Sequence, residues 1–197
     1  MHTREQQGRK PRADVQRNRA ALLEAAQRHF LRDGVGTSLE AVAKEAGVGP
    51  GTLYRHFPTR EALLAAVLQS RTEELEARRA DIAGIDDAGT ALTRWLRAME
   101  DYLSAYSGLP EPLMTATRAQ DPDNPLTVPC DELIATTDEY VQAAQRTGYV
   151  RPSVTGYDLF LAACSAAWIK GTGVTGESLD RLRALIANGY REPDDRT

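Results

Sequence analysis

Four polar side chains lie close together near residue 55, and their types suit contacts with nucleic acid. They are Thr52, Tyr54, Arg55 and His56. Hydroxyl and imidazole groups donate hydrogen bonds to phosphate oxygens, whereas a guanidinium group can bind O6 and N7 of guanine with two donors. Such a bidentate contact is worth roughly 1 to 3 kcal/mol of discrimination between bases. We therefore predict that Arg55 reads a base and that Thr52, Tyr54 and His56 contact phosphates.

Two short helices and a tight turn are predicted to position these side chains. The first helix is expected to begin at Thr37, whose hydroxyl can accept a hydrogen bond from the amide of Glu40 while the Glu40 carboxylate accepts one in return. It ends at Gly47, which can adopt the left-handed conformation, and Pro50 suits the first turn of the next helix. Hydrophobic residues recur at helical spacing in both helices: Leu39, Val42, Ala43, Ala46, Leu53 and Phe57. The pattern is typical of a helix-turn-helix motif.

Two glycines flank the predicted start of the second helix. Gly49 and Gly51 have no side chain, so this end of the helix can approach a duplex closely and present its backbone amides to phosphate. Gly51 is therefore a predicted DNA contact. The remaining predicted DNA contacts are Arg17, Thr37, Ser38 and Arg60.

The motif resembles the TetR family of bacterial transcriptional regulators. The resemblance lies in the run Thr-Leu-Tyr-Arg-His-Phe-Pro-Thr-Arg-Glu-Ala-Leu at 52–63 and in Ala-Val-Ala-Lys-Glu-Ala-Gly-Val at 41–48. It is strong over about residues 15–65, and it covers the rest of the chain only in length and helical layout. It implies an all-α fold, a homodimer on a palindromic operator in double-stranded DNA, and release of that operator by a small-molecule effector. Repression is expected from the resemblance alone.

Positions 49 and 50 depart from the family pattern. Many relatives have Ser and a Lys or Arg near these positions, where this chain has Gly49 and Pro50. The change removes one hydroxyl and one charge from the predicted recognition helix. An alternative hypothesis is therefore a helical protein-interaction module whose head no longer binds DNA.

The charge distribution favours a DNA-binding head. Residues 1–60 contain eleven Lys and Arg and six Asp and Glu, a net charge of plus five, whereas residues 61–197 contain thirteen and twenty-two, a net charge of minus nine. A basic head on an acidic body confines the attraction for phosphate to one part of the chain.

The first 13 residues are polar and include Arg9, Lys10 and Arg12. We predict a disordered basic arm at 1–13 that either follows a minor groove or remains a solvated tail. It contains no apolar stretch that resembles a signal peptide or membrane span. Cys130 and Cys164 do not suggest a disulfide framework, so a reducing cytoplasm is expected.

The apolar pattern beyond the arm predicts about nine helices in two units. A helix-turn-helix domain is expected at 14–60, with its first helix at 14–32, a ligand-binding and dimerisation domain at 61–190, and a tail at 191–197. A long fourth helix, capped by Thr59, joins the two domains. Further helices are expected at about 87–107, around Leu113 and Met114, and at 130–147, 155–170 and 177–190, with a loop at 120–129.

The last two helices are the predicted dimer interface, because one recognition helix reads too few bases and the related family pairs these helices. A monomer that buries the same residues internally is the alternative. The residues concerned are Leu159, Ala163, Ala167, Leu182, Leu185 and Ile186.

Aromatic and Met side chains of the body are predicted to line an effector pocket, although plain core packing is the alternative for each of them. They are Trp95, Met99, Tyr102, Tyr106, Met114, Tyr140, Phe160 and Trp168. Since Arg94 and Arg97 lie off the apolar stripe of their helix, an apolar, uncharged or weakly polar effector is expected.

No grouping of nucleophile and base, and no metal-ligand spacing of Cys and His, occurs in the sequence. The glycines at 47, 49 and 51 belong to the turn and not to a nucleotide-binding loop. The sequence therefore predicts a protein that is not an enzyme and has no cofactor and no metal.

Overall fold

A computed structural model describes the backbone of residues 9–193 and the side chains of residues 13–193. Within this range it contains nine α-helices and a single isolated β-bridge, between Val150 and Arg191. The chain divides after Leu68 into two compact units, which we call the head and the body. The expected all-α class is thus confirmed.

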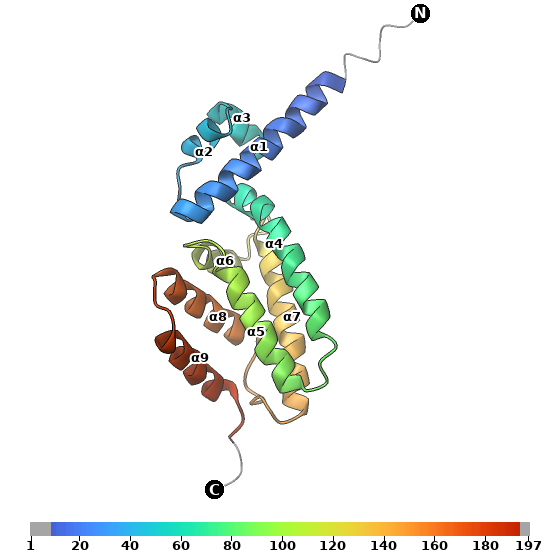
Figure 1. Ribbon diagram of the computed structural model, residues 1–197. Coiled ribbons are helices and arrows are strands. Elements are labelled where there is room, and N and C mark those ends of the chain that lie inside the picture. Colours follow the sequence, from blue (N-terminus) through green and yellow to red (C-terminus); the bar gives the residue numbers. More distant parts are fainter. Residues whose placement is uncertain (1–8, 194–197) are drawn as a thin grey trace, which may run out of the picture. The chain divides into compact units, whose positions relative to one another are not determined.

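The head contains α1 (Arg9–Asp33), α2 (Leu39–Glu45), α3 (Pro50–His56) and the first turns of α4 (Arg60–Ile82) (Figure 1). Helix α1 begins at Arg9, earlier than the predicted residue 14, so only residues 1–8 of the predicted arm lie outside the described residues. The side chains of Arg9, Lys10 and Arg12, predicted to follow a minor groove, also lie outside the description. Large apolar side chains that are fully buried form the head core: Leu22, Phe30, Leu53, Leu63 and Leu64.

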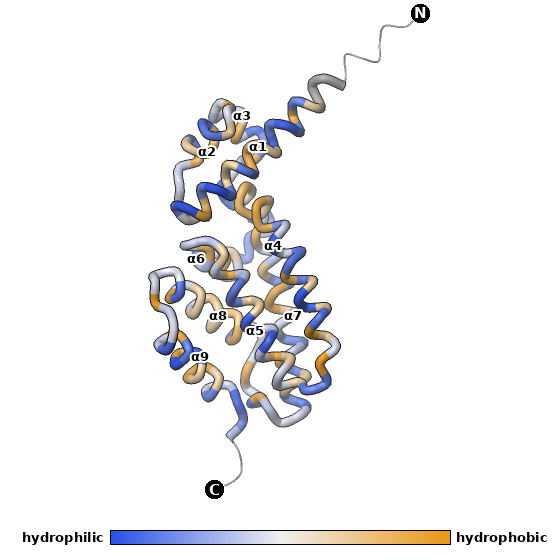
Figure 2. Tube along the Cα trace, in the orientation of Figure 1, coloured by the Kyte–Doolittle hydropathy of each residue, from blue (hydrophilic) through white to orange (hydrophobic). Residues whose placement is uncertain are grey.

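The body contains the rest of α4 and five further helices. These are α5 (Ala88–Leu103), α6 (Pro110–Ala119), α7 (Thr127–Arg146), α8 (Gly156–Gly171) and α9 (Glu177–Tyr190). Helices α5, α7 and α8 pack against one another, and α9 lies alongside α8 (Figure 1). Hydrophobic residues line much of α8, whereas α9 alternates hydrophilic and hydrophobic turns (Figure 2). Two predicted boundaries were wrong: α5 ends before 107, and α7 begins at Thr127 because Pro129 is accommodated in its first turn.

Trp95, one of the predicted effector residues, is fully buried in the body. The indole Nε1 of Trp95 donates a hydrogen bond to Thr137 Oγ1 at 2.9 Å, and its ring stacks on Tyr140 with centroids 5.4 Å apart. Thr137 Oγ1 in turn donates to the Leu133 carbonyl at 2.7 Å and lies 3.6 Å from Met99 Sδ. A buried indole whose N–H is satisfied in this way is a packing residue.

Helices α7 and α8 approach closely at Gly156. A Cβ atom there would lie 2.6 Å from the Asp138 backbone N and 2.7 Å from the Ile134 carbonyl oxygen. The Gly156 amide donates to Asp138 Oδ1 at 2.8 Å, which fixes the crossing. Among the described helices, none is both long enough and apolar enough to cross a membrane.

Candidate nucleic-acid interface

Helix α2 begins one residue later than predicted. Its N-cap is Ser38, whose Oγ accepts a hydrogen bond from the Ala41 amide at 3.2 Å and donates to Glu40 Oε2 at 2.8 Å. The Thr37 hydroxyl instead lies 3.3 Å from His29 Nδ1 on α1. The predicted capping box at Thr37 is therefore wrong, because the adjacent serine performs the capping and threonine is held by α1.

The turn between α2 and α3 follows the prediction. Gly47 has a φ of 71°, in the left-handed region that stops α2, and Gly49 is the N-cap of α3 with Pro50 directly after it. One face of α3 is buried through Leu53 and Phe57. The guanidinium of Arg19 on α1 lies 5.3 Å from the centre of the Phe57 ring, a cation–π contact that helps hold α3 on α1.

The opposite face of α3 carries the predicted phosphate and base contacts. Tyr54 is 43% exposed and Arg55 is exposed, whereas Thr52 and His56 are half-buried. The Tyr54 hydroxyl donates to Glu40 Oε1 at 3.4 Å. Arg55 Nε donates to the Gly51 carbonyl at 3.0 Å and Nη2 to Thr52 Oγ1 at 3.5 Å, so its guanidinium lies toward the N-terminal end of α3. That end is the part of a recognition helix that reads bases.

The N-terminal end of α3 is also free of obstruction. A Cβ atom added at Gly49 or Gly51 would meet no heavy atom within 4 Å, so neither glycine is required by packing inside the head. No side chain caps this end. Because Pro50 has no N–H and the Thr52 and Leu53 amides donate to the Gly49 carbonyl, at 2.9 and 3.2 Å, the Gly51 amide is the one that remains available to an anion at this end.

Two predicted DNA contacts have other partners. Arg60 is half-buried, and its Nη1 donates to the carbonyl oxygens of Val35 and Thr37, both at 2.7 Å. It ties the start of α4 to the loop before α2 and is better described as a positioning residue. Arg17 is exposed on α1 and forms an ion pair with Asp14.

Polar contacts between α1 and α2 were not foreseen from the sequence. Arg28 Nε donates to Glu45 Oε1 at 2.7 Å, and His29 Nε2 lies 2.9 Å from Glu45 Oε2. The hydrogen bond from Arg28 is the main reason that the pKa of Glu45 lies below its ordinary value. Spacing gave no signal for these pairs, since the partners lie on different helices.

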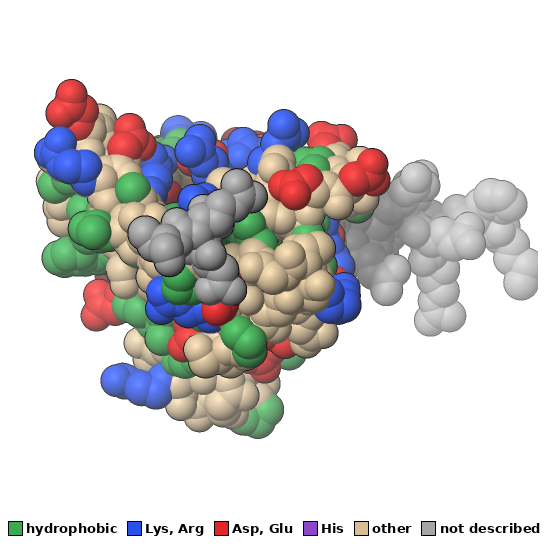
Figure 3. Space-filling view, turned by 90° about the horizontal axis from the view of Figure 1, so that it is seen from below, with side chains coloured by type: hydrophobic (Ala, Val, Ile, Leu, Met, Phe, Trp, Pro, Cys, Tyr) green, Lys and Arg blue, Asp and Glu red, His purple; other side chains and the backbone are tan. Residues whose placement is uncertain are grey.

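Charge is mixed elsewhere on the surface. On the face shown in Figure 3, acidic, basic and hydrophobic side chains are interspersed and no single-sign area dominates. Within the described residues, no group of three or more His, Cys, Asp or Glu is placed to hold a metal ion. Burial raises the pKa of the Cys130 and Cys164 thiols to about 12, so neither is activated as a nucleophile.

Comparison with family models accounts for both units. Residues 22–67 match the model for bacterial regulatory proteins of the tetR family, and residues 87–192 match that for the C-terminal domain of SbtR-like transcriptional regulators. The chain belongs to the TetR family.

Curated relatives of this TetR-family chain are transcriptional regulators. The chain is 38% identical to the HTH-type transcriptional regulator UidR of Escherichia coli K12 over 74 residues, which are 36% of this chain and 38% of that protein. It is 30% identical to the HTH-type transcriptional regulatory protein RaaS of Mycobacterium tuberculosis H37Rv over 136 residues, 68% of this chain and 60% of that protein. The chain thus spans between a third and two thirds of the length of these relatives.

Solved structures agree with the family assignment. The TetR regulator SCO0520 from Streptomyces coelicolor is 30% identical, with a TM-score of 0.53, and the match covers 89% of this chain and 99% of that one. A putative TetR regulator from Streptomyces avermitilis MA-4680, sav143, is 26% identical, with a TM-score of 0.56, and the match covers 87% and 97% of the two chains.

The predicted effector residues of this TetR-family body do not gather around one cavity. Trp95, Met99, Tyr106 and Phe160 are buried, Met114 and Tyr140 are half-buried, and Trp168 is 58% exposed. Tyr102 borders a hollow of only about 20 Å³, and its hydroxyl lies 3.3 Å from Thr72 Oγ1. A hollow of about 480 Å³ in the body is lined by none of these eight side chains.

The predicted dimer residues divide into two groups. Leu159, Ala163 and Ala167 are buried within the protomer, which leaves little of their surface to meet a second copy. Ile186 is half-buried and lines the same cavity as Leu159 and Ala163. Leu182 is half-buried like Ile186, and Leu185 is 70% exposed, so these three α9 side chains stay at least partly accessible.

Proposed function

We propose that the chain is a sequence-specific, DNA-binding transcriptional regulator that acts in the cytoplasm as a homodimer. One observation supports this most directly: α3 buries Leu53 and Phe57 while Tyr54 and Arg55 stay exposed beside an uncapped helix N-terminus. Such a helix can enter a major groove, with the Gly51 amide at a phosphate and the Arg55 guanidinium at base edges.

The roles of the individual side chains follow from their positions. Arg55 reads a base, because its guanidinium already lies at the N-terminal end of α3 and its two present hydrogen bonds are solvent-exposed and easily exchanged. Tyr54, Thr52 and His56 contact phosphates, as does Ser38 at the start of α2. Arg60 supports them by holding the loop that carries Thr37.

The proposed dimer surface is revised by the burial of α8. Tyr157, Leu161 and Trp168 lie outward at helical spacing on α8, and Leu182 and Leu185 lie outward on α9. Exposed large apolar side chains on neighbouring helices are characteristic of an interface. Two copies joined here would present two recognition helices to a palindromic operator.

Repression relieved by a small molecule is the proposed mode of action. It requires an effector that binds the conformation unable to hold DNA more tightly than the DNA-bound one, by the same factor by which DNA disfavours it. A head that has lost DNA binding and serves protein interaction is the competing proposal, favoured by Gly49 and Pro50.

Selection of bound duplexes from a random pool distinguishes the two proposals. The regulator should enrich a palindrome whose half-sites are one helical turn apart, and its affinity should fall steeply between low and moderate salt because phosphate contacts release counterions. No enrichment, together with binding that barely changes with salt, would favour the protein-interaction module.

A further inference from the structure

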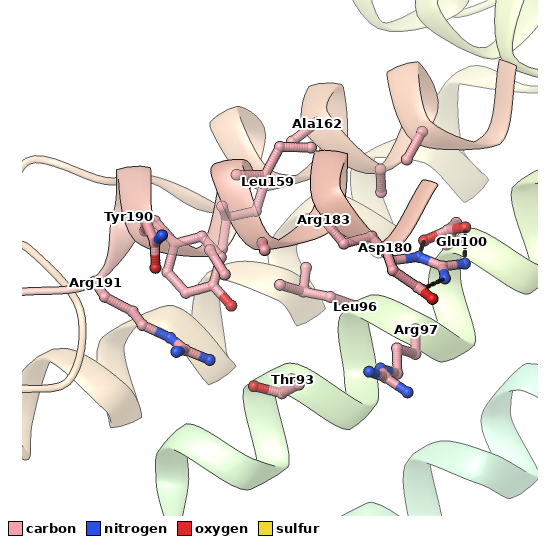
Figure 4. Close-up of a pocket in the computed structure, with 16 residues that line it drawn as sticks. Thr93, Leu96, Arg97, Glu100, Leu159, Ala162, Asp180, Arg183, Tyr190 and Arg191 are labelled. Carbon is pink, nitrogen blue, oxygen red and sulfur yellow. Dashed lines mark hydrogen bonds and ion pairs between the residues drawn. The ribbon is translucent and has the colours of Figure 1, made fainter. Parts of the chain in front are cut away.

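A hollow of about 480 Å³ lies in the body between α5, α8 and α9 (Figure 4). Its size falls within the range of small-molecule sites. Helix α5 contributes Thr93, Leu96, Arg97 and Glu100, which follow one face of that helix at helical spacing. The hollow therefore faces a stripe of α5 that combines polar and charged groups with one leucine.

Small apolar side chains form much of the two other walls, next to the polar and charged groups of α9. Helix α8 contributes Ala162, Ala163 and Ala166, and α9 contributes Ala184 and Ala187. Because alanines face the space from both helices, the space stays open where larger side chains would close it. Leu96, Leu159 and Ile186 complete an apolar lining. These walls suit the apolar part of a ligand.

The two acidic groups that line the hollow, Glu100 and Asp180, share one arginine. Glu100 is only 5% exposed, and Arg183 of α9 binds it with two donors, Nη2 to Oε1 at 2.6 Å and Nε to Oε2 at 3.0 Å. Arg183 Nη1 also donates to Asp180 Oδ1 at 2.8 Å. The Glu100 hydrogen bond is the main cause of the raised pKa of Arg183. Glu100 is therefore fully paired, whereas the cluster of two carboxylates and one guanidinium keeps a net charge of minus one, on the solvent-exposed side at Asp180.

Two further guanidinium groups border the hollow without such partners. Arg97 and Arg191 form no ion pair among the described residues, and Figure 4 places them on either side of Thr93. The Nε of Arg191 is shielded from solvent and has no hydrogen-bond partner within the described part of the chain, while its guanidinium lies 5.1 Å from the centre of the Tyr149 ring. A shielded donor without a partner is uncommon in folded proteins and indicates a missing acceptor.

A second hollow, of about 380 Å³, shares Thr93, Arg97 and Arg191 with the first. It adds Arg94, and its one acid, Asp87, is already engaged as the N-cap of α5, accepting from the Thr90 amide at 2.7 Å. The shared boundary of the two hollows is therefore positively charged. Tyr190 lines the first hollow, and burial raises the pKa of its phenol.

We propose that this hollow binds an amphipathic organic anion, a carboxylate or sulfonate on a compact apolar body. The apolar body lies between the alanines of α8 and α9, and the anionic group is bound by Arg97 and Arg191. The proposal deepens, and rests on, the proposed effector response, and it replaces the uncharged effector expected from sequence. It assigns the site to side chains outside the predicted aromatic set.

The test uses 8-anilinonaphthalene-1-sulfonate, an amphipathic anion that fluoresces in apolar surroundings, and its uncharged analogue N-phenyl-1-naphthylamine. The full chain should bind the sulfonate saturably, one per protomer, and at least about tenfold more tightly than the uncharged analogue, since hydrogen bonds to charged groups contribute more than neutral ones. The combined change Arg97→Gln and Arg191→Gln should remove that preference.

Two further variants show that the site is this hollow. Ala162→Leu fills the apolar wall and should weaken both probes, while Arg118→Gln removes an exposed arginine of α6 that borders neither hollow and should change nothing. Thermal midpoints of all variants are measured alongside to exclude unfolding. Equal affinity for the two probes, or a sulfonate affinity unchanged in the double arginine variant, would overturn the proposal.

Measuring DNA binding on the same samples separates this proposal from the proposed function. If the protein binds the sulfonate but selects no duplex, the ligand site is supported and the proposed DNA-binding function is refuted. If the protein binds DNA selectively but does not bind the sulfonate saturably, the proposed DNA-binding function is retained and the proposed ligand site is refuted. Decanoate should displace the sulfonate from the wild-type chain and decan-1-ol should not, which extends the result to carboxylates.

Discussion

The head and the body both contain arginine side chains that have no carboxylate partner among the described residues, but in opposite settings. Arg55 lies on the outer face of a seven-residue helix whose other side chains anchor it, so its surroundings depend on one turn and one helix. Arg97 and Arg191 border a hollow made by three helices from distant parts of the sequence. A surface that presents side chains to a long polymer can be specified locally, whereas a cavity for a small ligand requires the packing of a whole unit.

The first prediction concerns the anchoring of α3, where the largest effect is expected. Leu53 is 1% exposed, so Leu53→Ala should lower the free energy of unfolding of the head by about 2 to 5 kcal/mol through lost burial and a residual cavity. Urea unfolding followed by circular dichroism measures the change. Tryptophan fluorescence reports the body separately, because Trp95 and Trp168 are the only tryptophans in the chain.

The matched control is Leu31→Ala, also in the head, where the leucine is 65% exposed. Surface changes of this kind usually stay within about 0.5 kcal/mol. Similar losses from both leucines, or an equal shift of the tryptophan transition, would contradict the description of α3 as a locally anchored element of a separate unit.

The second prediction compares two glycines. In the body, Gly156→Ala places a Cβ against the backbone of α7, so we expect a loss of about 1 to 3 kcal/mol in stability. In the head, Gly51→Ala meets nothing within 4 Å and should leave stability unchanged or raise it by up to about 1 kcal/mol. Thermal and urea midpoints measure both effects.

DNA binding should reverse the order of these two variants. Gly51→Ala adds a methyl group where the end of α3 meets phosphate, so its affinity for the selected duplex should fall although the protein is no less stable. Gly156→Ala should retain affinity at temperatures where it is folded. Unimpaired DNA binding by Gly51→Ala would argue against close approach of this helix end to the duplex.

The third prediction separates base reading from phosphate contact on α3. Arg55→Ala should reduce the preference for the selected duplex over random DNA by about 1 to 3 kcal/mol, that is, roughly 5- to 150-fold. Tyr54→Phe removes one hydroxyl donor and should weaken binding to both duplexes alike. Fluorescence anisotropy with the two duplexes gives the four affinities, and equal losses on both duplexes for both variants would refute these roles.

The sequence predicted the head closely because helix ends depend on neighbouring residues. As predicted, Gly47 ends α2 and Pro50 begins α3. Thr59 caps α4, since its Oγ1 accepts a hydrogen bond from the Ala62 amide at 3.0 Å. The misplaced start of α2, Thr37 in place of Ser38, arose because two adjacent hydroxyls suit the same cap. His29, eight residues earlier, holds the threonine, and a local pattern contains no information about that contact.

In the body, periodicity identified buried faces but not empty space. Trp95 and Ala163 both lie on apolar stripes, yet Trp95 fills the core and Ala163 lines the hollow. Which stripe leaves a cavity depends on how far apart three helices lie, and on Arg183 reaching Glu100 across 83 residues of sequence. The arginines at the hollow were missed for the same reason, since an arginine off the apolar stripe of its own helix can still face a cavity formed by others.

The last prediction concerns acid, where the smallest effects are expected. Three carboxyl groups of the head have lowered pKa values. The main cause is a hydrogen bond from Arg28 for Glu45, a hydrogen bond from Arg32 for Asp33, and a hydrogen bond from its own backbone amide for Glu40. A carboxyl group whose pKa is lower in the folded state stabilises that state above its unfolded pKa, and the contribution is lost as pH falls through the folded pKa. The head should therefore lose stability below about pH 4.

The body should respond less, since only Asp87 among its described carboxylates has a clearly lowered pKa, caused by its hydrogen bond with Thr90. Amide NMR signals of the two units, followed from pH 7 to pH 3, measure the difference. Glu45→Gln is the control: it removes one of the head carboxylates, so its head should be less stable than wild type at pH 7 and approach it at pH 3. Because these groups are solvent-exposed, the shifts should be modest and should shrink in high salt. Loss of the body signals before the head signals on acidification would contradict this prediction. It would mean that the ion pairs between α1 and α2 do not determine the acid sensitivity of the chain.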